Sequence, residues 1–242
     1  MTSSNFSRPS RKFPDQTFPH HAPEGSAVGV RRPLLRGYFH AGAAIVAVFG
    51  VGLLLQLTVS DRLKQISLLI YGASSILLFA WSAYYHIGTW SRPRRLLMRR
   101  FDQAAIFVLI AGTYTPIVFN MLVGWWRVGL LGAVWGLAVL GTVVAAVRRI
   151  PRWVLGVLFM VTGWVALAAL PGFVLALGLH ALILPVLGGL LYTLGALVFA
   201  IRWPRLWPRI FGYHEVFHLA TIAANAVMFL FILQYVVPFT RH

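Results

Sequence analysis

The amino-acid sequence predicts an all-α membrane protein, a bundle of seven transmembrane helices. The chain of 242 residues is 59% hydrophobic and only 11% charged, whereas a soluble domain of average composition carries about 25% charged residues. It contains seven apolar runs, each close to the roughly 20 residues that a helix needs to cross a bilayer. Trp and Tyr stand at several ends of these runs, as expected for amphipathic rings at the membrane surface.

The chain divides into a polar tail and a membrane domain. Residues 1–35 are rich in Ser, Pro and Arg and are predicted to form a disordered basic tail in the cytoplasm. This tail lacks the apolar core of a signal peptide, and the first apolar run after it is long enough to span. Residues 36–242 form the predicted seven-helix domain. Its spans fall near residues 39–59, 66–88, 103–122, 128–147, 153–170, 180–201 and 214–237.

Glycines inside the runs predict where helices approach one another closely. Gly132 and Gly136 are four residues apart, and Gly188 and Gly189 are adjacent. Because small side chains let two helix backbones come together in a membrane, we expect these positions at helix contacts.

The basic residues are divided unevenly between the two sides of the predicted bundle. Of the 21 Lys and Arg residues, 17 lie in the tail and in the loops after the second, fourth and sixth spans, and 4 lie on the other side. Since loops rich in Lys and Arg stay in the cytoplasm, this division predicts a cytoplasmic N-terminus and an external C-terminus. The basic residues that give the formal net charge of +16 are therefore expected to set the topology and to contact anionic lipid headgroups. They are not interpreted as a nucleic-acid binding surface.

Ionisable residues within spans are costly, which makes each of them a candidate functional residue. His86 lies near the end of the second span, one helical turn after Ser82, and Asp102 opens the third span. His214 and His218 open the seventh span. The second span ends, and the third and seventh begin, on the predicted cytoplasmic side. These residues are therefore expected in one layer, about one or two turns inside the membrane boundary.

Three histidines at one depth predict a zinc site. The chain has no cysteine, so that a transition metal would be held by His, Asp or Glu. His214 and His218 are four residues apart and project from one face of a helix. Together with His86 they fill three positions of a tetrahedral Zn²⁺ site and leave one for water. Asp102 is expected close by, to orient a ligand or to accept a proton from that water.

The stretch GYHEVFH at residues 212–218 also contains the His-Glu-x-x-His signature of zinc proteases. Such enzymes often find their third ligand downstream. No acidic residue follows Glu215, and the only histidine after His218 is His242. A helix also turns Glu215 about 100° away from His214. A protease is therefore the less favoured interpretation. His40 opens the first span at the same depth. An interfacial histidine is the favoured interpretation for it, and a partner of a ligand is the alternative.

Four segments together resemble the hemolysin III family, the bacterial branch of the progestin and adipoQ receptor group. They are SAYYH (82–86), FDQAAIFVLIAGTYTPI (101–117), LGGLLYTLGA (187–196) and GYHEVFH (212–218). The resemblance runs from about residue 36 to the C-terminus. It implies a seven-helix bundle of the bacterial inner membrane, with a zinc site on the cytoplasmic side. It also implies His86, His214 and His218 as zinc ligands, with Asp102 and Ser82 beside them as catalytic residues. One position departs from the pattern, because Gln103 follows the aspartate where many relatives have histidine.

Relatives of this group include ceramide-hydrolysing enzymes, so the resemblance implies a zinc-dependent hydrolase of lipid amide or ester bonds, with a role in membrane lipid homeostasis. Two other interpretations stay open. One is a non-catalytic, lipid-sensing regulator with structural zinc, and the other is a pore-forming haemolysin. The expected partners are membrane lipids.

Overall fold

The computed structural model of the chain describes residues 37–147, 151–204, 206–207 and 211–241. The predicted tail, residues 1–35, lies outside the described residues. Within the described part, seven helical segments are long and apolar enough to cross a membrane, which confirms the predicted fold class. They are α1 (Tyr38–Gln56), α2 (Arg62–Ile87), α3 (Arg92–Met121), α4 (Gly124–Ala146), a fifth that begins with α5 (Arg152–Trp164), α7 (Ile183–Ile201) with a preceding short 3₁₀ turn, and α8 (Tyr213–Phe231) with a π-helical end.

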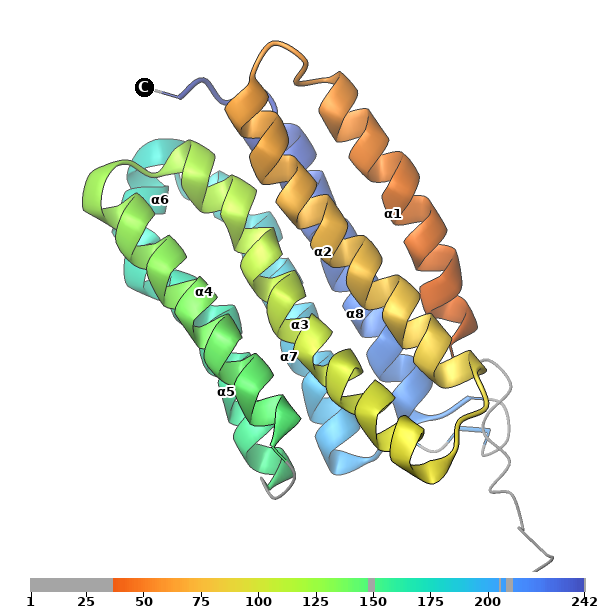
Figure 1. Cartoon of the computed structure of the whole chain (residues 1–242). Helices are drawn as coiled ribbons and strands as arrows, with labels where there is room; N and C mark the ends of the chain where they lie inside the picture. The colour runs from red at the N-terminus through yellow and green to blue at the C-terminus, as the bar shows by residue number, and fades with distance from the viewer. Residues whose placement is uncertain (1–36, 148–150, 205, 208–210, 242) are drawn as a thin grey trace, which may run out of the picture. The chain divides into compact units, whose positions relative to one another are not determined.

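Each spanning segment packs against its neighbours in the bundle, and the helices run up and down in alternation (Figure 1). Contacts lead from α1 through α2, α3, α4, α5, α7 and α8, and return from α8 to α1. The end of α2 and the beginnings of α1, α3 and α8 therefore lie at the same end of the bundle. This arrangement brings together the ends that carry the candidate site.

The structure differs from the sequence expectation at the start of the third span. The arginine-rich segment after the second span was expected to be a loop, but it forms the first turns of α3, which begins at Arg92. Arg and Leu are strong helix formers, and Pro93 fits the first turn, where its missing N–H costs nothing. The apolar run therefore continues a helix that had already begun among the arginines.

The fifth span is interrupted. After Trp164 the chain continues as a 3₁₀ helix, η1 (Val165–Ala169), and then as the short helix α6 (Leu170–Leu177). Pro171 lies in the first turn of α6. A proline there cannot extend a preceding α-helix, because its ring clashes with the carbonyl one turn earlier and it has no N–H to donate.

The glycines predicted at helix contacts divide into two groups. An added Cβ at Gly188 would lie 2.9 Å from Met228, and one at Gly189 would lie 3.1 Å from Trp164. At Gly132 and Gly136 an added Cβ meets no described atom within 4 Å. Gly188 and Gly189 thus lie at contacts with other helices of the chain, as predicted, and Gly132 and Gly136 do not.

The end of the bundle opposite the histidines is held by the C-terminal segment. Lys64 at the start of α2 is only 6% exposed, and its ammonium donates to the carbonyl oxygens of Val237 at 2.8 Å and Phe239 at 2.6 Å. Arg241 donates to Asn120 at the end of α3 and forms a salt bridge with Asp61. The last residues of the chain therefore join the beginning of α2 to the end of α3.

Candidate metal centre

Three histidines from two helices meet at one end of the bundle. His86 lies in the last turn of α2, and His214 and His218 lie in the first two turns of α8. One nitrogen from each ring lies within 4.8 Å of the others. The Nε2 atoms of His86 and His214 are 3.3 Å apart, although the two residues are 128 positions apart in the sequence. Three imidazole nitrogens this close to one another form a donor set of the kind that binds a transition metal.

A carboxylate lies beside this cluster. Asp102, the eleventh residue of α3, places Oδ2 3.9 Å from Nε2 of His86, and its side chain is 18% exposed. Ser82, one turn before His86 on α2, is 2% exposed and interacts with the Asp102 side chain. The structure therefore brings together all five residues that the sequence singled out, His86, His214, His218, Asp102 and Ser82.

His40 belongs to the same site. Its ring stacks on that of His218, with centroids 4.0 Å apart and planes within 9° of parallel. It is 3% exposed, and neither ring nitrogen has a hydrogen-bond partner within the described part of the chain. This placement favours the alternative role for His40, the partner of a candidate ligand, over the interfacial histidine expected from the sequence.

Glu215, the acid of the His-Glu-x-x-His stretch, is used at the start of its own helix. Its Oε2 accepts a hydrogen bond from the Gly212 N–H at 2.9 Å, and the side chain is 1% exposed. This is the acidic half of a capping box, which satisfies a backbone donor that the helix leaves unpaired. The contact explains the glutamate between the two histidines without a protease mechanism.

An apolar cavity of about 190 Å³ begins next to the histidines and lies among α3, α5, α7 and α8. Phe217 lines it, and its ring centroid is 5.9 Å from that of the adjacent His218 and 6.4 Å from that of His214, although no histidine lines the cavity among the described residues. On α8 the lining continues to Phe231, which is 14 residues or about 21 Å further along the helix. The polar side-chain groups in the lining are the hydroxyls of threonine and tyrosine and the indole N–H of Trp164, and none of the lining residues carries a formal charge. The cavity therefore suits a long apolar chain.

The fold and this cluster define a seven-helix membrane protein with buried histidines and a carboxylate at one end of the bundle. A family model described as haemolysin-III related matches residues 28–229, a range that includes every residue of the cluster. The chain is 33% identical over 174 residues to the "Hemolysin-3 homolog" of Bacillus subtilis (strain 168), covering 71% of this chain and 78% of that protein. It is 31% identical over 171 residues to "Hemolysin-3" of Bacillus cereus, covering 70% and 74% of the two chains.

The chain belongs to the haemolysin-III related family. This confirms the resemblance inferred from the four sequence segments.

Proposed function

We propose that this protein is a zinc-dependent hydrolase of lipid amide or ester bonds, with a role in membrane lipid homeostasis. The observation that supports this function best is that a candidate metal site and an apolar cavity lie close together. The histidine cluster with Asp102 lies near one end of an apolar cavity, and Phe217, which lines the cavity, is adjacent to His218 in the chain. A lipid chain in the cavity would place the bond that joins it to its headgroup beside the cluster.

The donor set fits zinc. Imidazole nitrogens suit Zn²⁺, and catalytic zinc sites have three protein ligands with a fourth position left for water or substrate. His86, His214 and His218 would hold the ion. When bound there, Zn²⁺ would supply a Lewis acid that polarises a carbonyl group and lowers the pKa of water.

Asp102 is the general base of the proposed reaction. Its Oδ2 accepts a proton from the attacking water, whose oxygen adds to the substrate carbonyl carbon. When the bond from that carbon to nitrogen or oxygen breaks, Asp102 returns the proton to the leaving amine or alcohol. Ser82 interacts with the carboxylate and keeps it in position. His40 holds the ring of His218 by stacking.

The cluster end of the bundle is proposed to face the cytoplasm of a bacterial inner membrane, with the N-terminus inside. The support is the division of basic residues, 17 on that side and 4 on the other. A reporter active only outside the cytoplasm should work when fused after Arg241 and fail when inserted after Ser91. The reverse pattern would reject the orientation.

The name of the Bacillus cereus relative, "Hemolysin-3", supports a second candidate, a pore-forming haemolysin. Lysis of red cells by the purified protein, unaffected by loss of the histidines, would favour this candidate over the hydrolase.

The central test measures zinc and turnover on the same samples. Detergent-purified protein is analysed for metal and incubated with a panel of ceramides, other acyl amides and acyl esters. We expect about one zinc per chain and release of a fatty acid. His86→Ala should lose both, whereas His180→Ala, at the opposite end of the bundle, should lose neither. Full zinc with no turnover of any substrate would reject the enzyme and leave a regulator with structural zinc.

A further inference from the structure

The apolar cavity reaches the lipid-facing surface along one seam of the bundle. Leu167 of η1, Leu170 of α6 and Val186 of α7 all line the cavity, yet they are 55%, 41% and 43% exposed. On a membrane-spanning segment, exposed apolar side chains face lipid acyl chains. The interior of the cavity is therefore separated from the bilayer only by side chains at the seam between α5 and α7.

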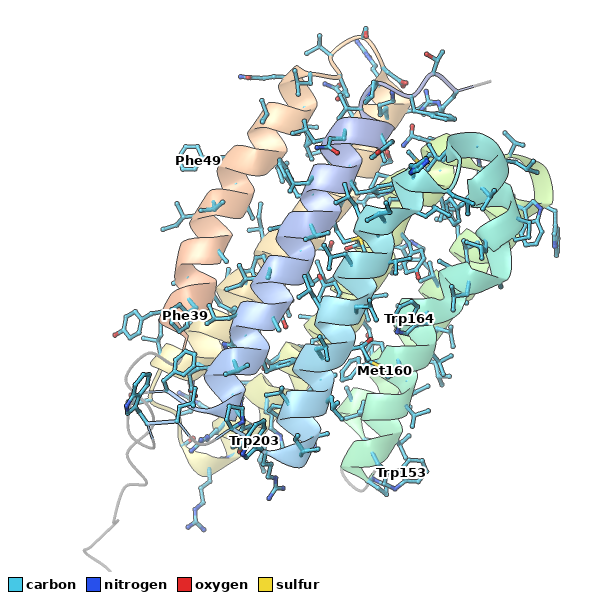
Figure 2. All side chains as sticks on the ribbon, turned by 180° about the vertical axis from the view of Figure 1, so that it is seen from behind. Phe39, Phe49, Trp153, Met160, Trp164 and Trp203 are labelled. Carbon is cyan, nitrogen blue, oxygen red and sulfur yellow. The ribbon has the colours of Figure 1, made fainter. Side chains whose placement is uncertain are left out.

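Trp164, the last residue of α5, lies across this seam. Its indole Nε1 donates to Thr193 Oγ1 at 3.0 Å, and its ring packs on Gly189, where an added Cβ would be 3.1 Å away. Thr193 in turn donates to the Gly189 carbonyl at 2.8 Å. Figure 2 shows Met160 and Trp164 projecting from α5 on the side of α7. One large side chain thus lies across the seam, where it packs on Gly189 and is held by one hydrogen bond.

The backbone around Trp164 is suited to movement. The α-helix ends at this residue and continues as a 3₁₀ helix, whose hydrogen bonds have poorer geometry. The break is tied to α3 through Tyr114, whose hydroxyl donates to the Gly163 carbonyl at 2.7 Å and accepts from the Ala166 N–H at 3.3 Å. Tyr114 therefore fixes a pivot next to Trp164, about which the indole can leave Gly189 while α5 stays attached.

We propose that Trp164 gates a lateral portal through which the acyl chain of a membrane lipid passes from the bilayer into the cavity. The uncharged lining selects an apolar chain. Sideways entry also lets the polar headgroup stay at the membrane surface, whereas lengthwise threading would draw it through hydrocarbon at a high cost. This inference rests on the part of the proposed function in which the cavity receives a lipid chain, and it does not require hydrolysis.

The chain offers a matched pair of substitutions for the test. Thr193→Val removes the acceptor of the Trp164 indole while keeping the shape of the side chain. Thr115→Val makes the same change in a second Trp–Thr pair, in which Trp135 of α4 donates to Thr115 of α3 at 3.2 Å. Thr115 does not line the cavity among the described residues. A general loosening of the bundle would therefore affect both variants, and a gate would affect only the first.

The experiment follows a fluorescent polyene fatty acid as it moves from lipid vesicles into the protein in nanodiscs, by energy transfer from the tryptophans. A net hydrogen bond contributes about 0.5–1.5 kcal/mol, so Thr193→Val should speed both entry and exit by about 2- to 13-fold. Thr115→Val should leave both rates unchanged, and Trp164→Ala should speed them further. Equal rates in all four proteins would overturn the proposal, as would equal acceleration in the two threonine variants. A wild-type protein that takes up no chain would overturn it too, whereas uptake without cleavage rejects the hydrolase and leaves the portal.

Discussion

Replacing Asp102 by asparagine separates the roles of this residue as base and as a support for the metal. The substitution keeps the size of the side chain and removes its basicity. Oδ2 is 3.9 Å from His86 Nε2, which is beyond hydrogen-bond distance. That nitrogen lies closer to His214, at 3.3 Å, than to the Asp102 carboxylate. The loss of zinc affinity should therefore lie at or below the lower end of the 10- to 100-fold range typical of such supporting residues.

The effect on rate should be much larger. Removal of a general base typically costs about 10²–10⁴-fold, which corresponds to about 3–5 kcal/mol in the activation free energy. The assay measures the turnover of the best lipid amide or ester by wild type and Asp102→Asn, at saturating zinc and with bound zinc measured on each sample. Asp61→Asn makes the same chemical change at the opposite end of the bundle and should keep the wild-type rate. Equal turnover by wild type and Asp102→Asn would refute the role of base, and loss of zinc in step with activity would show a supporting role instead.

Two further outcomes follow from the contacts of the bundle. His40→Ala should weaken zinc binding by about 2- to 13-fold, because an aromatic pair contributes about 0.5–1.5 kcal/mol. His40→Phe should restore the affinity, since its ring can still stack on His218. The affinities are measured by competition with a chelator, and equal values for the wild type and His40→Ala would contradict this role. Burial raises the pKa of Asp61, but the backbone N–H of Lys64 and the guanidinium of Arg241 lower it more, so that the pKa lies below its usual value. The salt bridge therefore stabilises the protein above the unfolded pKa of the carboxyl, and this contribution is lost as pH falls through the folded pKa. Arg241→Ala should lower the Tm by about 1–4 °C at neutral pH. In acid this difference should shrink to the part due to the hydrogen bond of Arg241 to Asn120; a difference independent of pH would contradict the assignment.

The fold and much of the candidate site followed from the sequence because both depend on simple periodicities. A run of about 20 apolar residues has few alternatives to a spanning helix. Once the spans alternate in direction, His86, Asp102 and His214 must share one end of the bundle. The spacing of four residues then places His218 on the same face as His214. Each of these steps uses only helix geometry and the order of the spans.

Other features depend on side-chain packing that a single sequence does not display. The sequence alone could not separate an interfacial His40 from a His40 that supports a ligand. The stacking of its ring on His218 depends on how α1 packs against α8. The cavity was missed because its lining residues have the same composition as residues that face lipid. The break after Trp164 was missed as well, although Pro171 was a visible signal for it.

The attachment of Lys64 also affects how the chain is made. Its ammonium is buried on the second spanning helix, but its acceptors at Val237 and Phe239 lie 173 and 175 residues further along the chain. At a synthesis rate of about 5–20 residues per second, they emerge on the order of ten seconds or more after the lysine. During that interval the ammonium must remain in water or among headgroups, since a lone charge within the bilayer is costly. The hydrogen bonds that hold the start of α2 to the C-terminal segment can therefore form only after the last residues of the chain have been translated.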